Sequence, residues 1–374
     1  MKAVLRPVRI IGTGSFLPGD PVPNTRLDEI LGSLDQAPPR VQKFLGNIGP
    51  VMLEKGGVER RHFAIDPATG ALTHTAASLA EQAARRALEA AGREPREVDL
   101  LLLSCPSSDY STPPTSTILQ ELLGIEQCAE MEIHSNCSGV GKCMQIAFDA
   151  LRCGRYRNAL VSYAQLSSVY LRGCYFNQTQ MNKTQAALRY ILADGSGAVF
   201  LEAAETDAPC GQEVLGAYIE SVGGRRRPGM TAGGAIADLM HPDRQTQAVF
   251  EAGSHHLDQD FTAVNNDAVP TLIKGVQGML RSLNLQGPQI DHYIFSIPGR
   301  QLYEANLERV TAVFGIGPER AKFRAQDTGY CGGASVLLHF DEMVRSGELK
   351  PGQTAVVYSI ESSKWMSGGF VVRW

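Results

Sequence analysis

Cys137 is the residue whose type and position most clearly suggest chemistry. The apolar residues before it predict a buried strand and the Ser and Gly residues around it a sharp turn. The residues after it show helical spacing: Met144, Ile146, Ala147, Ala150 and Leu151. The unpaired N–H groups and positive dipole end of a helix favour a thiolate and lower the thiol pKa. Cys137 is therefore a candidate nucleophile, and the alternative is a buried cysteine acting as a small apolar residue.

Two further residues could have a role in chemistry at Cys137. His134 lies three residues before it and is a candidate base, with structural packing as the alternative. Cys331 is followed by two glycines at the start of another predicted helix, and we interpret it as structural. The sequence alone does not fix the direction of the His134 side chain.

The densest positive cluster of the chain is Arg225-Arg226-Arg227, which lies in a glycine-containing loop. Guanidinium groups bind phosphates and carboxylates, so the cluster is a candidate site for the anionic groups of a ligand or partner. The alternative is a solvated loop without a ligand.

Composition limits the classes of protein that the chain can belong to. With 374 residues, of which 43% are hydrophobic and 20% charged, it can form a large core and two domains or one duplicated domain. The formal net charge of −4 argues against a general nucleic-acid binder. The eight cysteines form no CxxC pair and no zinc-finger spacing, so we expect reduced thiols and no metal site. Without a signal-peptide core or a long apolar run, the sequence predicts a cytoplasmic protein with no membrane segment.

Helices and strands alternate along the first half of the sequence. We predict a helix from His74 to Ala91 and strands at Val98–Cys105 and Asn158–Tyr163, which favours a mainly parallel sheet with helices on both faces. A short helix over residues 26–31 is expected to be capped by Asn24 or Thr25. Residues 35–57 show little periodicity and predict loop with short helix. The glycine-rich stretch at 194–198 lacks a phosphate-loop pattern and predicts a tight turn before a strand.

The second half of the sequence repeats the first. A composition shift at residues 204–211 suggests halves of 1–205 and 206–374. The second contains predicted strands at 214–222 and 293–296 and predicted helices at 264–283 and 301–314. Cys137-Ser138-Gly139, a helix and Arg152-Cys153-Gly154 are echoed by Cys331-Gly332-Gly333, a helix and Arg345-Ser346-Gly347. Two related halves would place both helix starts near a pseudo-twofold axis. We therefore expect a single active site between them.

The ordered motifs of the chain resemble the thiolase-like condensing enzymes, and among them the β-ketoacyl-acyl carrier protein synthase III type. The matching motifs span essentially the whole chain: Ile10–Ser15 with Leu17-Pro18, Gly57–His62, Asn136–Gly139, Asp194–Ala198 and Val371–Trp374. The resemblance implies a duplicated α/β fold with αβαβα layers, usually in a homodimer. It also implies that Cys137 accepts an acyl group from a phosphopantetheine thioester, either acyl-CoA or acyl carrier protein, with no permanently bound cofactor. The cluster Arg225-Arg226-Arg227 is then a candidate site for the phosphates of coenzyme A or for an acidic carrier protein.

The resemblance also implies two catalytic partners that this sequence lacks. Family members stabilise an enolate with a histidine and an asparagine, and the matching positions here are Ser296 and Tyr330. His292 does not replace the histidine, because four residues along a strand displace it by roughly 13 Å. The family's second oxyanion donor comes from a glycine-rich turn that here reads Glu361-Ser362-Ser363-Lys364-Trp365, so the backbone N–H near Ser363 is the candidate.

These substitutions lead to three hypotheses about function. Losing one enolate donor typically slows such a reaction by about 10² to 10³, whereas acyl transfer needs only a nucleophile, an oxyanion site and a proton path. We therefore expect an acyltransferase in fatty-acyl or polyketide biosynthesis, with a small-molecule or carrier-bound acceptor. The alternatives are a carbon–carbon condensing enzyme with an altered site and a non-catalytic subunit that pairs with an active synthase in a heterodimer.

Overall fold

A single mixed sheet organises the molecule. The computed structural model describes residues 5–204, 212–240 and 245–374. Nine strands pair in the order β11 (His292–Phe295), β12 (Thr354–Glu361), β13 (Met366–Arg373), β8 (Glu213–Ser221), β1 (Val8–Phe16), β7 (Gly195–Ala203), β6 (Asn158–Gln165), β4 (Leu100–Cys105) and β5 (Ala129–His134). Strands β1 and β8, the first of each half, meet at the centre through the pair Arg9 and Glu213.

The prediction of a mainly parallel sheet is wrong. Among the described strands only β4–β5, β4–β6 and β11–β12 pair in parallel, and the other neighbours are antiparallel. Strands β12 and β13 are joined by residues 362–365 alone, and a connection this short permits only antiparallel pairing. The helical crossovers that suggested a parallel sheet occur only within the β4, β5 and β6 units and between β11 and β12.

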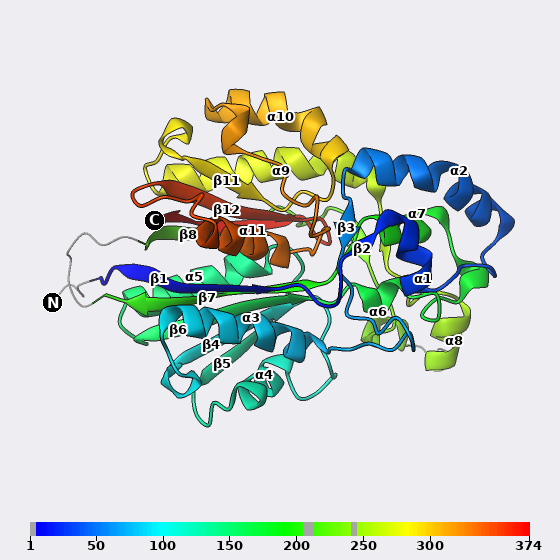
Figure 1. Cartoon of the computed structure of the whole chain (residues 1–374), viewed down its shortest axis with the longest axis horizontal. Helices are drawn as coiled ribbons and strands as arrows, with labels where there is room; N and C mark the ends of the chain where they lie inside the picture. Colours follow the sequence, from blue (N-terminus) through cyan, green and yellow to red (C-terminus); the bar gives the residue numbers. More distant parts are fainter. Residues whose placement is uncertain (1–4, 205–211, 241–244) are drawn as a thin grey trace.

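Helices cover both faces of the two half-sheets and also fill the space between them (Figure 1). In that view α9 (Phe261–Ser282) and α10 (Arg300–Phe314) form the top layer, and α3 (Ala76–Ala91) and α4 (Thr115–Leu123) form the bottom layer. The central helices α5 (Gly139–Arg152) and α11 (Ala334–Arg345) each contact strands of both halves. The expected αβαβα arrangement is confirmed.

The order of strands agrees with the predicted duplication. Strands β1, β7, β6 and β4 follow outward from the centre on one side, and β8, β13, β12 and β11 follow on the other. Helices α5 and α11 occupy matching central places, as the repeated motifs predict. The boundary proposed at 205/206 lies outside the described residues and stays a prediction.

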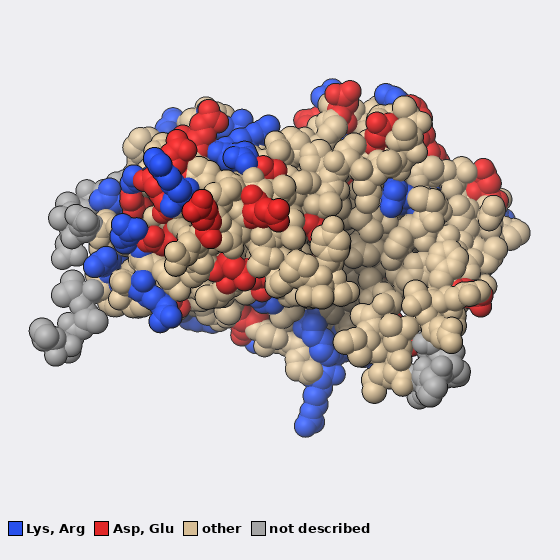
Figure 2. All heavy atoms as spheres, turned by 90° about the horizontal axis from the view of Figure 1, so that it is seen from below, with Lys and Arg blue, Asp and Glu red and all other residues tan. Residues whose placement is uncertain are grey.

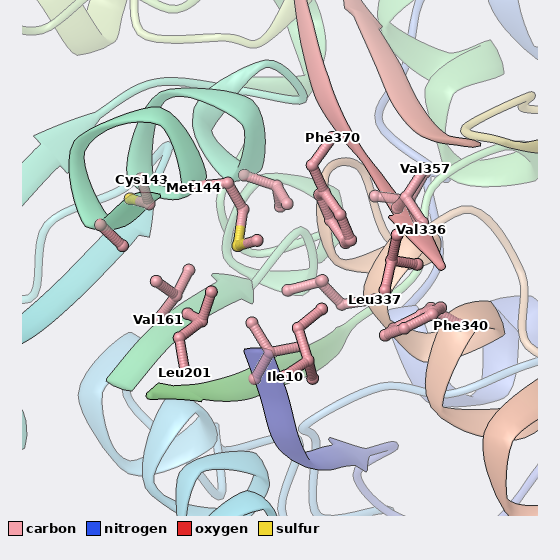
Figure 3. Close-up of a cluster of buried hydrophobic side chains, with 14 of the residues drawn as sticks. Ile10, Cys143, Met144, Val161, Leu201, Val336, Leu337, Phe340, Val357 and Phe370 are labelled. Carbon is pink, nitrogen blue, oxygen red and sulfur yellow. The ribbon is translucent and has the colours of Figure 1, made fainter. Parts of the chain in front are cut away.

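The core between the half-sheets holds both central helices in place. Cys143 and Met144 of α5 and Val336, Leu337 and Phe340 of α11 point into one cluster with strand residues of both halves (Figure 3). All five side chains are buried. Gly141 allows α5 to pack directly on β13, because a Cβ atom there would lie 2.4 Å from the Gly368 carbonyl carbon. The position of the α5 N-terminus is therefore fixed by both halves.

Further helices extend from one end of the layers, on the right in Figure 1. They are α1 (Leu27–Leu31), α2 (Pro39–Gly56), α6 (Ser168–Leu171), α7 (Lys183–Ala187) and α8 (Thr246–Glu251). The prediction of loop and short helix for residues 35–57 is wrong, because α2 spans eighteen of these residues. It buries only Val41 and Gly49, so the sequence shows no strong apolar stripe. Asn24 does not cap α1; its side chain donates to the Val58 carbonyl instead.

The surface matches the modest net charge. On the face seen from below, acidic and basic side chains intermingle toward one end, whereas the other end is mostly uncharged (Figure 2). The described residues of this face form no broad basic surface of the kind that binds a polyanion. Within the described part of the chain, no helix has both the length and the apolar character to cross a membrane.

Candidate active site

Cys137 lies in the turn between β5 and α5, as predicted, and lines a cavity of about 1050 Å³. The same cavity is lined by His134, Ser296, Tyr330 and Ser363. The structure therefore brings together at one site all five residues that the sequence suggested for catalysis. Whether each of them acts in a reaction stays a prediction.

Tyr330 is the side chain in direct contact with the candidate nucleophile. Its hydroxyl lies 3.1 Å from the Cys137 sulfur, within hydrogen-bond distance. The Tyr330 backbone is anchored to the first half, because Ala193 N–H donates to its carbonyl at 2.9 Å. Burial, followed by the neighbouring Cys137, raises the Tyr330 pKa well above its ordinary value. The phenol therefore stays protonated and acts as a hydrogen-bonding group and not as a base.

Ser296 immediately follows β11 and is 2% exposed. Its hydroxyl lies near the phenol of Tyr330, whose pKa it lowers against the larger effect of burial. The geometry falls short of a hydrogen bond, and the Ser296 hydroxyl has no other partner among the described residues. His292 lies at the start of β11, where its Nε2 contacts the Gln353 side chain at 3.2 Å, and it does not line the cavity. His134 is the only histidine among the described residues that line it.

A buried carboxylate beneath the Cys137 turn is the main feature that the sequence reasoning missed. Glu361, at the end of β12, is 2% exposed. It accepts from the Ser135 hydroxyl at 2.7 Å, the Ser138 hydroxyl at 2.6 Å and the Ser138 N–H at 3.2 Å. The Ser363 hydroxyl also donates to it, and Lys142 Nζ donates to Ser135 at 2.8 Å. Glu361 therefore ties the start of α5 to the turn that follows β12.

The prediction that the helix start lowers the Cys137 pKa is wrong for the protein at rest. Burial raises the pKa of the thiol to about 12, which outweighs the lowering effect of the Tyr330 hydrogen bond. The Glu361 carboxylate raises it further. One N–H of the helix start, that of Ser138, already donates to Glu361 and so is not free to stabilise a thiolate. The thiol is therefore protonated at neutral pH before a substrate binds.

A pKa near 12 predicts how alkylation of Cys137 depends on pH. Below the pKa, the thiolate fraction rises tenfold with each pH unit, so the rate of reaction with iodoacetamide should keep rising through about pH 9. Mass spectrometry of digested protein measures this rate at Cys137 and, as an internal reference, at the exposed Cys153 and Cys174. A plateau at Cys137 below about pH 8 would show that the resting protein already forms the thiolate.

We expect Glu361→Gln to destabilise the protein, because an amide cannot accept hydrogen bonds at both of its ends. The four donors around a buried carboxylate suggest a loss of about 2 kcal/mol in the free energy of unfolding. Burial alone would raise the Glu361 pKa, but the hydrogen bonds from Ser138, Ser363 and Ser135 and the Lys142 charge leave it lowered.

Because the folded-state pKa is lowered, the stabilisation by Glu361 is present above the ordinary value of 4.5 and decreases as the pH falls below it. Urea unfolding of wild-type and Glu361→Gln protein at neutral and acidic pH measures this difference. Ser363→Ala, which removes one donor only, is the matched control and should lose less. An equal difference between Glu361→Gln and wild type at both pH values would contradict the account.

The two predicted oxyanion donors are both available. Cys137 and Ser363 line the cavity, and within the described residues neither backbone N–H donates to another residue, although the Cys137 N–H acts on its own thiol. The side chain of Trp365, by contrast, turns away from the cavity and packs with Val264 and Ala268. Its backbone has φ near +60°, a conformation that glycine adopts more easily. The turn after β12 therefore retains its cavity-lining backbone despite its lack of glycine.

The arginine cluster does not behave as a unit. Arg226 stacks on the Trp365 ring at 4.3 Å and pairs with Asp267 at 2.5 Å. Arg225 and Arg227 are exposed, and no ion pair of theirs occurs among the described residues. They lie just before Met230, which lines the cavity. Arg226 therefore stabilises the turn after β12, and the phosphate-binding prediction now rests on the other two.

Replacing both Arg225 and Arg227 with alanine should weaken the binding of a coenzyme A donor severalfold and reduce its salt dependence, because two screened charge interactions are lost. Donor KM at low and high salt measures the effect. Arg226→Ala is the contrasting variant and should mainly lower thermal stability. Unchanged donor KM at both salt concentrations would remove Arg225 and Arg227 from donor binding.

Cys331 occupies the mirrored helix start but faces the core. It is fully buried, its sulfur contacts the Asp194 carbonyl at 3.2 Å, and it does not line the cavity. Asp194 in turn accepts from the Ala64 and Ser168 N–H groups, each at 2.8 Å, just before β7 begins. The contacts of the Cys331 sulfur and of the Asp194 carboxylate agree with a structural role for Cys331 and for the glycine-rich stretch at 194–198. The described residues contain no group of side chains placed to hold a metal ion.

Comparisons with known proteins agree with this fold and site. Residues 131–223 match the family model of 3-oxoacyl-[acyl-carrier-protein] synthase III, and residues 280–374 match the model of its C-terminal part. A β-ketoacyl-[acyl-carrier-protein] synthase III from Methylococcus capsulatus is 28% identical over 353 residues, which are 93% of this chain and 94% of the relative.

Solved structures extend the similarity to the whole fold. A tetronic acid condensing enzyme, AbyA1, is 25% identical with a TM-score of 0.74, covering 98% of this chain and 100% of that one. The 3-oxoacyl-(acyl carrier protein) synthase III of Pseudomonas aeruginosa has a TM-score of 0.75 at 20% identity and covers 99% and 98%. A variant of OleA from Xanthomonas campestris has a TM-score of 0.77 at 19% identity and covers 99% and 97%.

The chain belongs to the thiolase-like β-ketoacyl-acyl carrier protein synthase III family of condensing enzymes.

Proposed function

We propose that this protein is an acyltransferase that forms an acyl thioester on Cys137 and passes the acyl chain to an acceptor in fatty-acyl or polyketide biosynthesis. The proposal rests mainly on the groups that surround the Cys137 thiol. Cys137 lies in a large cavity at the start of α5, and its polar contact is the Tyr330 hydroxyl at 3.1 Å. No imidazole from the second half lines the described cavity, and Ser296 and Tyr330 stand at the positions where the resemblance implies the histidine and asparagine that stabilise the enolate.

In the proposed reaction, Cys137 attacks the carbonyl carbon of a coenzyme A or carrier-protein thioester. A bond forms between that carbon and the Cys137 sulfur, the carbon–sulfur bond of the donor breaks, and the thiol proton leaves with the donor's sulfur. The N–H groups of Cys137 and Ser363 are the proposed oxyanion donors. Tyr330 orients the thiol through its hydrogen bond. Transfer to the acceptor repeats the exchange in reverse.

A carbon–carbon condensing enzyme with an altered site is the second candidate. The tetronic acid condensing enzyme at 25% identity and the Methylococcus capsulatus β-ketoacyl synthase favour it, because both carry condensing activity in their names. In this reading His134, Ser296 or Tyr330 takes an unfamiliar role. A non-catalytic subunit is the third hypothesis, and the cavity around Cys137 argues against it.

Challenging the acyl-enzyme with different acceptors separates these candidates. Protein loaded with an acyl thioester is mixed with a malonyl carrier protein or with alcohol and amine acceptors, and intact-protein mass spectrometry follows the loss of the acyl mass. An acyltransferase should release the acyl group to a hydroxyl, amine or thiol. Product formation with the malonyl carrier alone would favour condensation, and a protein that never gains an acyl mass would favour the non-catalytic role.

We also propose a homodimer joined through β5, with a heterodimer of related synthases as the alternative. Strand β5 is one of the two outer strands of the sheet, its side chains are half-buried or exposed, and Met131 is 39% exposed. Open edge strands are usually covered in stable proteins. Light scattering after size exclusion measures the assembly, and a monomer at all concentrations would contradict the proposal.

A further inference from the structure

The hydrogen-bond donors around Glu361 are divided unevenly between its two carboxylate oxygens. Oε2 accepts from the Ser135 hydroxyl at 2.7 Å and from the hydroxyl and the N–H of Ser138 at 2.6 Å and 3.2 Å. Oε1 accepts from the Ser363 hydroxyl and, among the described residues, from no other group. Each carboxylate oxygen has about two acceptor sites. Oε1 is therefore the oxygen that still has room to take up a proton.

Ser363 connects this buried carboxylate with the cavity around Cys137. Glu361, Ser135 and Ser138 are all buried, and none of them lines the cavity. Ser363 lines the cavity and is only partly buried. Of the described donors to Glu361, Ser363 is thus the one that a bound substrate can reach.

The same carboxylate keeps the Ser363 hydroxyl near the nucleophile turn. Glu361 holds the N–H of Ser138, the residue after Cys137, on one oxygen and the Ser363 hydroxyl on the other. The backbone N–H of Ser363 is also the proposed second oxyanion donor. The Ser363 side chain is therefore placed to meet an acceptor that approaches an acyl group on Cys137.

The charge state of Glu361 suits a proton acceptor. Burial acts to raise its pKa, but the hydrogen bonds from Ser138, Ser363 and Ser135 and the Lys142 charge leave the pKa below 4.5, so the carboxylate is ionised at neutral pH. The Cys137 thiol has a pKa of about 12. A proton held by Glu361 would therefore pass readily to a Cys137 thiolate.

We propose that Ser363 and Glu361 relay the proton of an acceptor that attacks the acyl group on Cys137 through a hydroxyl or a neutral amine. This inference rests on the proposed acyltransferase function. The acceptor's oxygen or nitrogen bonds to the acyl carbon, its proton passes to Ser363 Oγ, and the Ser363 proton passes to Glu361. The carbon–sulfur bond to Cys137 then breaks, and the proton returns through Ser363 to the sulfur, which restores the thiol.

The relay favours one class of acceptor over another. An alcohol keeps its proton at neutral pH, and an attacking amine must lose one to leave a neutral amide, so both gain from a positioned base, typically by about 10² to 10⁴ in rate. A thiol attacks as its thiolate, which has already lost the proton. A carboxylate-bound serine in the cavity therefore fits an ester or amide product better than a new thioester.

Three acceptors that differ in one group test the relay: N-acetylethanolamine, N-acetylethylenediamine and N-acetylcysteamine. Protein acetylated by acetyl-coenzyme A is mixed with each of them, and intact-protein mass spectrometry follows the loss of the acetyl group. Ser363→Ala should lower the ratio of the alcohol rate to the thiol rate at least tenfold, and likewise the ratio of the amine rate to the thiol rate. Ser363→Thr keeps a hydroxyl and should recover most of both ratios.

Ser362→Ala is the matched control. Ser362 also lines the cavity, but its hydroxyl contacts Gln259 and not Glu361, so its loss should keep the wild-type ratios. Glu361→Gln should lower the ratios as Ser363→Ala does, and the two changes together should lower them no further, because they interrupt one path. If Glu361→Gln does not fold, the Ser363 variants decide alone.

The ratios separate a proton relay from a structural role of Ser363. A misplaced oxyanion site would slow transfer to all three acceptors alike, so equal slowing in Ser363→Ala, or ratios that do not change, would overturn the relay and leave the acyltransferase function standing. Transfer from the wild-type protein to the thiol alone would also overturn it. If acetyl-coenzyme A and longer acyl donors all fail to acylate Cys137, the proposed function fails and the relay fails with it.

Discussion

Cys137→Ala protein is expected to acquire no acyl mass from any thioester donor and to lose acyl transfer by roughly 10⁴-fold or more, as expected when a covalent nucleophile is removed. The change removes one sulfur atom from a side chain that contacts Tyr330 at 3.1 Å. Loss of a single partly buried atom should cost only about 1 kcal/mol of stability. Intact-protein mass spectrometry and thermal unfolding of the same sample measure both effects.

Cys153→Ala is the matched control for this experiment. Cys153 is exposed at the end of α5 and does not line the cavity, so its replacement should leave acylation unchanged. Full acylation of the Cys137→Ala protein would exclude this residue as the nucleophile. Peptide mapping would then identify the modified side chain.

The second large effect is expected from replacing Ser296 and Tyr330 together. In Ser296→His with Tyr330→Asn, the smaller asparagine vacates space beside the buried serine, which leaves room for an imidazole. The pair would supply donors for an enolate, each typically contributing about 10² to 10³ in rate. We expect carbon dioxide release from a malonyl thioester to rise by about 10²-fold over wild type.

Tyr330→Phe controls for the loss of the tyrosine hydroxyl alone. It keeps the ring but removes the contact with Cys137, so it should not gain decarboxylation. A double variant that folds and acylates at Cys137, yet releases carbon dioxide no faster than wild type, would show that the two positions do not limit this chemistry.

The sequence predicted the parts of the site that depend on local patterns. Cys137 was placed correctly because a strand, a turn and a helix follow one another in a short stretch. The contact between Cys137 and Tyr330 joins residues 193 positions apart and followed only from the resemblance and the duplication. Glu361 was missed because its partner Ser138 is 223 positions away and no local pattern marks a buried carboxylate.

The wrong predictions also have physical causes that local sequence patterns do not show. The pKa of Cys137 was predicted from the helix start, whose effect is limited to about 2 kcal/mol, and burial acts more strongly in the opposite direction. The mixed sheet was missed because helical crossovers reveal parallel neighbours but do not reveal that β1 and β8 pair antiparallel at the centre. The sequence did not predict helix α2, because only two of its residues are buried, which leaves no clear apolar periodicity, and because it contains Pro50.

Carbon dioxide release by the wild-type acyl-enzyme tests the central claim most directly. Protein acylated on Cys137 is mixed with a malonyl carrier protein labelled at the free carboxyl, and released label and β-ketoacyl product are measured together. The account predicts a stable or transferable acyl group with almost no carbon dioxide, because neither Ser296 nor Tyr330 supplies the imidazole and amide donors. Stoichiometric carbon dioxide release coupled to a β-ketoacyl product would contradict it and establish the condensing enzyme instead.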